Sequence, residues 1–122
     1  MAEGHRIEIV PSSQHVEVVV DGVKVAESHE PTILYETGLP PRYYLPLSGV
    51  RSELLEPSEK HTHCPFKGEA SYWTLKVDGR SYEDFFWTYP TPIPESEKIA
   101  GLVSFYNDKA DLYVNGEPWT PA

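Results

Sequence analysis

The sequence lacks several features that mark well-known protein classes. Its single cysteine, Cys64, cannot form a disulfide within the chain. No run of about 18 apolar residues is present, and no apolar stretch of signal-peptide length follows Met1, so we expect a cytoplasmic protein. Basic residues are scarce, because 10 Lys and Arg stand against 19 Asp and Glu. The net charge of −9 should repel phosphate backbones and anionic lipids, so we predict neither a nucleic-acid nor a membrane partner.

Aromatic residues and prolines are abundant instead. The 3 Trp, 8 Tyr and 4 Phe supply a large area for burial although only 39% of the residues are hydrophobic. The 12 prolines remove backbone donors and fix φ, which disfavours long helices. A chain of 122 residues has the usual size of one domain, so we predict a single domain over residues 1–122.

Three short segments share a hairpin signature. Each has a turn dipeptide, Asp21-Gly22, Asp78-Gly79 or Asn115-Gly116, between β-branched or aromatic neighbours. These dipeptides tolerate the positive φ values of a two-residue type I′ turn. Their unequal spacing excludes a solenoid repeat. We therefore predict three hairpins within one fold.

Further strands are expected over residues 6–10, 32–35, 71–77 and 102–106. Helix signals are weak and are confined to residues 48–55 and 94–101. Residues 87–94 carry three prolines and are expected to form an extended connector. The fold class predicted is all-β: a compact domain of two packed or tent-like sheets with at most two short helices.

Four segments resemble, in their order, a known family. They are Tyr43-Tyr44-Leu45-Pro46, residues 62–70 around Cys-Pro-Phe-Lys-Gly, residues 87–90 and residues 99–106. Together they resemble the family called domain of unknown function 427, also called a nucleotidyltransferase-like domain. The resemblance covers about residues 15–116, and its most specific part is the Cys-Pro-x-Lys-Gly element. It implies a compact β-rich fold and no particular substrate.

The transferase name can be tested against the residues themselves. Two-metal nucleotidyl transfer needs acidic side chains that converge on Mg²⁺ from a rigid element. Asp108 and Asp111 flank an expected turn, while the adjacent Glu83 and Asp84 would point to opposite faces of a strand. Nucleotidyl transfer is therefore the less favoured interpretation. We predict no cofactor, because no P-loop or dinucleotide-binding glycine pattern is present.

The candidate catalytic residues are Cys64 and Lys67. Pro65 suits a turn after Cys64 and Gly68 relieves its exit, so the amides of residues 66–68 are expected to form a small anion-binding concavity. The ammonium of Lys67 would complete this concavity and favour a thiolate at Cys64. The alternative is an ordinary turn that contains a buried, inert cysteine.

Five further residues are predicted to bind a ligand. Between residues 42 and 67 the sequence has one more basic than acidic residue, a positive island that would steer a small anionic ligand to it. Aromatic side chains at positions 43, 44, 73 and 87 could wall a pocket there, although burial in the core is the simpler role for each. The predicted ligand-binding residues are Arg42, Tyr44, Thr62, Gly68 and Trp87.

Zinc binding is the other chemistry that the residues of this segment could support. His61, His63 and Cys64 have suitable donor atoms, but strand alternation would separate the two histidines from the cysteine. The remaining histidines, at positions 5, 15 and 29, lie far away in sequence and lack ligand spacing. The sequence therefore predicts no metal site and no structural zinc.

Two classes of function remain open. The first is a small-molecule binder or enzyme that uses the residues named above in an aromatic-walled pocket. The second is a non-catalytic module whose exposed aromatic residues and strand edges dock a protein partner of unknown identity. A concave pocket at the Cys-Pro-Phe-Lys-Gly turn would favour the first class, and a flat apolar patch elsewhere would favour the second.

Overall fold

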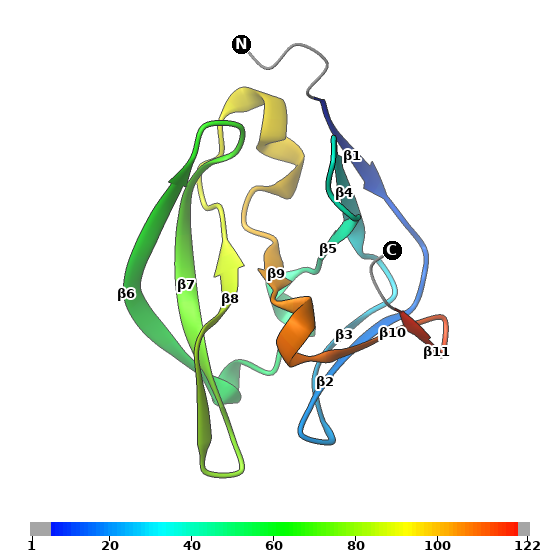
Figure 1. Cartoon of the computed structure of the whole chain (residues 1–122), viewed down its shortest axis with the longest axis vertical. Coiled ribbons are helices and arrows are strands. Elements are labelled where there is room, and N and C mark those ends of the chain that lie inside the picture. The colour runs from blue at the N-terminus through cyan, green and yellow to red at the C-terminus, as the bar shows by residue number, and fades with distance from the viewer. Residues whose placement is uncertain (1–5, 120–122) are drawn as a thin grey trace.

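Strands dominate the computed structural model, which describes residues 6–119 (Figure 1). The described residues form eleven strands and four short 3-10 helices. The strands are β1 (Ile7–Pro11), β2 (Val16–Val20), β3 (Val23–Ser28), β4 (Thr32–Glu36), β5 (Arg42–Tyr44), β6 (Leu55–Cys64), β7 (Gly68–Val77), β8 (Arg80–Thr88), β9 (Val103–Phe105), β10 (Asp111–Val114) and β11 (Glu117–Trp119). The predicted all-β class is confirmed.

The strands form three antiparallel sheets where the sequence predicted two. Their orders are β1-β4-β5, β11-β10-β2-β3 and β6-β7-β8-β9. A single bridge joins the first sheet to the last, because Leu45 and Val103 exchange two backbone hydrogen bonds of 2.8 Å. Pro46 follows Leu45 and lacks an N–H, so it cannot donate to such a ladder. The sheets therefore meet at a junction instead of merging, with β9 between the two sides of the molecule in Figure 1.

The three predicted hairpin turns are confirmed. Asp21, Asp78 and Asn115 have φ values of 52°, 49° and 53°, and the glycine after each also has positive φ. Positive φ at both central positions defines the type I′ turn. The flanking pairs close as expected, with Val20 opposite Val23, Val77 opposite Arg80 and Val114 opposite Glu117. Local turn chemistry thus sets the register of three hairpins.

The helical segments are short, as the sequence predicted, although the last of the four lies outside the two segments where helix was expected. They are η1 (Leu47–Gly49), η2 (Ser52–Leu54), η3 (Pro94–Ile99) and η4 (Asn107–Lys109), and η3 is kinked at Ser96. Within residues 6–119 no helix is long and apolar enough to cross a membrane.

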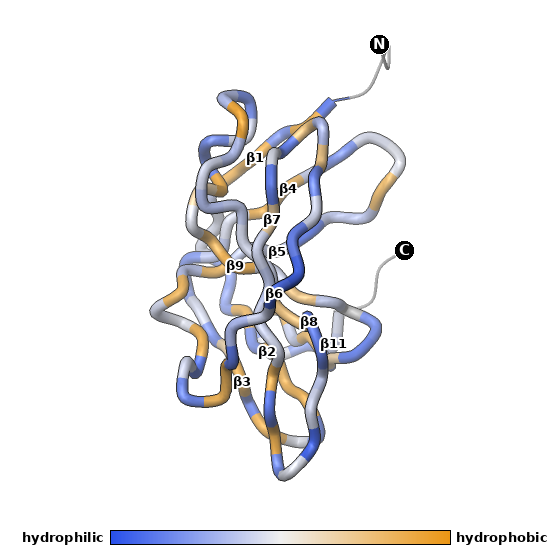
Figure 2. The backbone as a smooth tube through the Cα atoms, turned by 90° about the vertical axis from the view of Figure 1, so that its left-hand side faces the viewer, coloured by the Kyte–Doolittle hydropathy of each residue, from blue (hydrophilic) through white to orange (hydrophobic). Residues whose placement is uncertain are grey.

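Two details of the sequence prediction were wrong. Residues 87 and 88 do not belong to an extended connector: Trp87 pairs with Tyr72 on one side and Ser104 on the other, within the central strand β8. All three prolines follow this strand, so the expected connector could begin only after residue 88. Strand β6 was not among the expected strands, because most of its residues are exposed and it has no apolar alternation to detect. Figure 2 shows β6 mainly in the blue and white of polar residues.

The buried side chains fall into two clusters. The larger cluster lies between the β11-β10-β2-β3 sheet and one face of β7 and β8, and includes Val18, Leu75 and Phe86. The smaller cluster is rich in aromatic residues and lies at the junction near β4, β5 and β8, where Tyr44, Trp87 and Tyr89 pack together. The candidate site is built on this second cluster.

Candidate functional site

A pocket of about 240 Å³ opens at the junction of the β1-β4-β5 and β6-β7-β8-β9 sheets. This volume lies a little below the roughly 300 Å³ at which ligand pockets usually begin, so it suits a small ligand. The first sheet and the loop after β4 supply one wall, and β7, β8 and the turn before β7 supply another. The lining residues are Leu34, Glu36, Leu39, Pro40, Arg42, Tyr44, Lys67, Tyr72, Trp87, Tyr89 and Tyr106.

A shielded ion pair lies in the pocket wall. Lys67 Nζ is 3.0 Å from Glu36 Oε1, and the two side chains are only 15% and 10% exposed. Little water reaches these charges, so their interaction is screened far less than that of a surface pair. The pair fixes the ammonium of Lys67 at the edge of the pocket.

Arg42 brings a second positive charge to the same pocket. Its Nη1 donates to the Phe105 carbonyl oxygen at 3.0 Å, and its guanidinium carbon lies 5.1 Å from the centre of the Trp87 ring. The ring face attracts the cation and the hydrogen bond fixes its orientation. Since Glu36 is the one acidic residue in the lining, the described pocket carries one excess positive charge.

Aromatic rings form much of the pocket wall. The rings of Trp87 and Tyr106 are 4.8 Å apart, and those of Trp87 and Tyr72 are 6.3 Å apart. Burial raises the pKa of Tyr44 to about 12, partly offset by a hydrogen bond with Trp87 and by the nearby Arg42. Burial also raises the pKa of Tyr89. Both phenols are therefore neutral at physiological pH and can act as hydrogen-bond donors or acceptors.

The turn between β6 and β7 is fixed from outside by the proline-rich segment. The Lys67 amide donates to the Cys64 carbonyl at 3.1 Å, and the Lys67 carbonyl accepts from the Ile93 amide at 2.9 Å. Ser96 Oγ donates to the Phe66 carbonyl at 2.8 Å. Gly68 has φ +117°, and a Cβ there would lie 3.2 Å from Pro92 Cα. Only glycine combines this conformation with such a close approach.

The pocket includes four of the seven residues singled out from the sequence. Arg42, Tyr44, Lys67 and Trp87 line it together. Thr62 is exposed and is not among the lining residues, but its Oγ1 is 2.7 Å from the hydroxyl of Tyr72, which is. Cys64 is half-buried against the smaller aromatic cluster and is not among the lining residues, and the same holds for Gly68, which closes the turn.

The arrangement around the turn also differs from the expected concavity. The ammonium of Lys67 pairs with Glu36, and its amide is used within the turn. Sequence reasoning missed Glu36 because its partner is distant in the chain and nothing local marks the contact.

Strand alternation explains which aromatic residues face the pocket. Tyr43 packs in the larger cluster with Trp73, whereas the neighbouring Tyr44 and Tyr72 line the pocket. Adjacent residues of a strand point to opposite faces, so one member of each aromatic pair reaches the pocket. This separation assigns Tyr43 and Trp73 to the core.

The acids considered for two-metal chemistry lie outside the pocket lining. Glu83 is exposed, and Asp84 accepts a hydrogen bond from Ser58. Asp108 and Asp111 are also exposed, on η4 and at the start of β10. A lining with one carboxylate, already paired with Lys67, does not provide the converging acids that two Mg²⁺ ions require.

Comparison with known proteins places the chain in a family. A search of the curated proteins finds no match to this chain. The family described as "Domain of unknown function (DUF427)" matches residues 8–116, which include every residue of the pocket lining. The match begins before the region suggested by the motifs and ends at the same residue. The chain belongs to the DUF427 family.

Proposed function

We propose that this protein binds a small anionic ligand with a planar group in the pocket at the sheet junction. The observation that carries the proposal is the presence of Arg42 and Lys67 in one aromatic-walled pocket with a single carboxylate. A guanidinium offers five N–H donors in a planar fork, of which the Phe105 carbonyl accepts one bond. Carboxylate and phosphate groups match that fork, and aromatic faces favour a flat ligand body.

The two cations have different roles in this proposal. Lys67 is paired with Glu36, so it contributes a fixed field and little net charge of its own. Arg42 is oriented by the Phe105 carbonyl and the Trp87 ring and by no ion pair like that of Lys67. The anion is therefore expected to bind Arg42 directly, while Tyr44 and Tyr89 supply neutral hydrogen-bonding groups.

Titration calorimetry with benzoate and phenyl phosphate as probes tests this proposal. Arg42→Met should weaken binding by about 2 kcal/mol, or roughly 30-fold, because it removes charge-assisted hydrogen bonds. Arg51→Met is the matched control, since Arg51 pairs with Glu53 outside the pocket. Thermal unfolding of both variants checks that the fold is retained. Equal binding by wild type and a folded Arg42→Met variant would contradict the proposal.

A catalytic role for Cys64 and Lys67 stays a prediction. If Cys64 carries chemistry, iodoacetamide should alkylate it in the folded protein below pH 8, and Lys67→Met should slow that reaction. The half-buried thiol and the pairing of Lys67 with Glu36 both favour a small effect. If Cys64 is alkylated only after unfolding in urea, the catalytic role is contradicted, and ligand binding remains the proposed function of the pocket.

A second candidate function is the docking of an extended peptide. Strand β1 is the edge of its sheet, and a groove of about 480 Å³ lies between β1 and η3. An exposed sheet edge beside a groove is the setting in which peptides add as an extra strand. Ile9→Pro would remove a backbone donor from this edge strand, and loss of a protein partner with unchanged binding of benzoate would favour this function.

A further inference from the structure

A cluster of two histidines and a glutamate lies outside the pocket, on the β2–β3 hairpin. His15, Glu27 and His29 each offer one ligand atom, and these atoms all lie within 4.8 Å of one another. The imidazole rings of the two histidines are stacked, with centres 4.2 Å apart and planes inclined by 13°. Neither histidine has a spacing in sequence that suggested a site.

Strand pairing brings these residues together. In the β2–β3 ladder Val16 lies opposite Ser28 and Glu17 opposite Glu27, so His15 and His29 flank the last pair of the ladder. Side chains two residues apart share a face, which places the two histidines and the two glutamates on one side of the hairpin. The hairpin turn therefore creates a cluster from residues that are distant in sequence.

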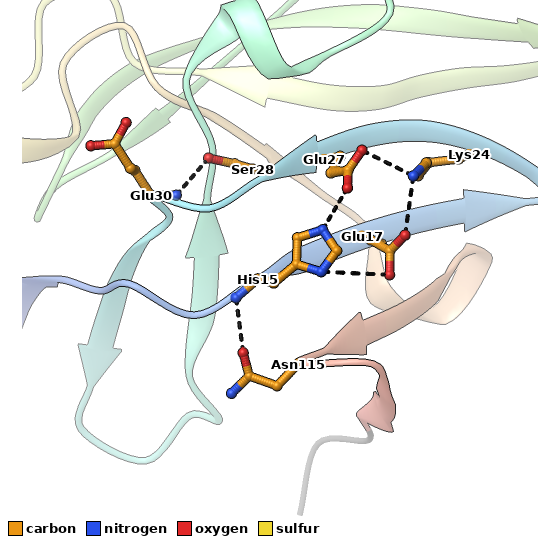
Figure 3. Close-up of polar contacts among 7 residues, drawn as sticks. All are labelled: His15, Glu17, Lys24, Glu27, Ser28, Glu30 and Asn115. Carbon is orange, nitrogen blue, oxygen red and sulfur yellow. Dashed lines mark hydrogen bonds and ion pairs between the residues drawn. The ribbon is translucent and has the colours of Figure 1, made fainter.

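The backbone of His15 is fixed from a third strand pair. Its amide donates to Asn115 Oδ1 at 2.9 Å (Figure 3). Its carbonyl accepts from the Asn115 amide at 2.7 Å. Asn115 belongs to the turn between β10 and β11. A side chain whose backbone is held at both ends loses less conformational freedom when it binds a ligand.

The side-chain contacts show where a cation would bind. His15 Nε2 lies 2.5 Å from Glu27 Oε2, and His15 Nδ1 lies 3.9 Å from Glu17 Oε1. In Figure 3 the His15 ring lies between the two carboxylates. A carboxylate on the second nitrogen is the usual way in which a metal-binding imidazole is oriented.

Lys24 competes for the same carboxylates. Its Nζ is 2.9 Å from Glu27 Oε1 and 3.1 Å from Glu17 Oε2, and its side chain is 45% exposed. Two glutamates directly opposite each other repel, and the ammonium relieves that repulsion. A divalent ion would relieve it more fully, and an exposed lysine side chain is free to leave.

We propose that His15, Glu27 and His29 form a surface site for one divalent transition-metal ion of the zinc type. Two imidazoles and one carboxylate are a donor set that zinc uses, with water in the fourth position of a tetrahedron. Bonds of about 2.0–2.2 Å would place the ion between His15 Nε2 and Glu27 Oε2 after these two atoms separate. The site differs from the one considered at His61, His63 and Cys64, whose residues do not form a ligand group among residues 6–119.

Titration calorimetry with ZnCl₂ on the full-length, untagged protein, after removal of metal by a chelator, tests this site. Wild type should bind about one zinc ion per chain. His15→Ala and His29→Ala should each weaken binding by at least about tenfold, since loss of an outer partner alone costs 10- to 100-fold. His63→Ala is the matched control, because His63 is an exposed histidine on β6. Absence of binding, or equal loss in the control, would overturn the proposal.

Two further measurements distinguish this site from weak zinc binding by any exposed histidine. Lys24→Met should tighten zinc binding because it removes the competing ammonium, and an unchanged or weaker affinity would contradict the assigned geometry. Proton NMR of the wild type needs no variant to fold. Added zinc should shift the imidazole signals of His15 and His29 and leave those of His61 and His63 in place, whereas uniform shifts would overturn the proposal.

Discussion

Two lysine–glutamate clusters in this molecule have similar distances and different surroundings. Lys67 and Glu36 are 3.0 Å apart in the pocket wall, with side chains 15% and 10% exposed. Lys24 lies 2.9 Å from Glu27 and 3.1 Å from Glu17 on the β2–β3 hairpin, where the three side chains are 25% to 45% exposed. Distance alone does not distinguish the clusters. Access to water does, because it determines the cost of leaving one charge without its partner.

The comparison teaches that the two clusters suit different tasks. The shielded pair holds a charge in a fixed position in the pocket wall, and loss of either partner would leave the other charge shielded from water and unpaired. The exposed cluster can exchange one cation for another with little effect on the fold. Four predictions extend this contrast between shielded and exposed positions, in order of decreasing effect.

Glu36→Gln should have the largest effect. It leaves Lys67 charged and shielded from water, so the free energy of unfolding should fall by about 3 kcal/mol, the lower end for a broken buried pair. Glu17→Gln in the exposed cluster should change it by less than about 1 kcal/mol. Urea unfolding at pH 7 measures both. The double variant Glu36→Gln/Lys67→Met should recover most of the loss, and equal effects of the two single variants would remove the distinction.

Alkaline pH should destabilise the pocket region next. Because burial raises the pKa of Tyr44 from 10.0 to about 12, the folded state keeps this proton at a pH where the unfolded state releases it. Stability should therefore fall as the pH rises from about 10 towards 12, by about 2–3 kcal/mol from this group. Tyr44→Phe should show a smaller fall over that range in urea unfolding. Tyr35→Phe, at a side chain 42% exposed, should match the wild type.

Gly68→Ala should cost about 2 kcal/mol. The new Cβ combines a φ of +117° with a contact 3.2 Å from Pro92 Cα, so the turn that carries Lys67 must move away from the proline-rich segment. Gly22→Ala also has positive φ but no atom within 4 Å of its Cβ, so about 1 kcal/mol is expected there. Thermal unfolding of the two variants gives the difference. Similar losses would mean that the close approach contributes nothing.

The smallest effect is expected at Glu27 in acid. Lys24 and then His15 hold the pKa of Glu27 below its usual value of 4.5, so its contribution is present above that pH and is lost as the pH falls through the lower folded-state value. The difference in stability between wild type and Glu27→Gln should therefore shrink below about pH 4.5. It should also shrink in 0.5 M NaCl at pH 7, because exposed charges are screened. A difference independent of both pH and salt would contradict this assignment.

Local chemistry explains how much of the fold could be predicted. Asp21-Gly22, Asp78-Gly79 and Asn115-Gly116 each carry their turn in two residues, so the hairpins were readable from the sequence. Strand β6 was harder to predict, because a strand at the exposed edge of a sheet requires no alternation of apolar and polar residues. The place where two of the sheets meet is the contact between Leu45 and Val103, and no residue adjacent in sequence signals that contact.

The same reasoning applies to the two sites. Lys67 was identified from the Cys-Pro-Phe-Lys-Gly turn, Arg42 from the local excess of positive charge, and Tyr44 and Trp87 as aromatic residues near both. The partner of Lys67 was missed, and so was the stacking of His15 on His29. Both depend on pairing between strands, which joins residues without any local signal. His5 and the ends of the chain lie outside the described residues.

The bridge between Leu45 and Val103 also bears on the order in which the chain folds. Hairpins with two-residue turns form in microseconds because their ends are already close, whereas joining positions 45 and 103 must close the long intervening loop. The two walls of the pocket therefore come together only when this long-range contact forms. We expect any form of the chain that has its hairpins but lacks this contact to have no affinity for the proposed ligand, so ligand binding during refolding would follow the contact between Leu45 and Val103.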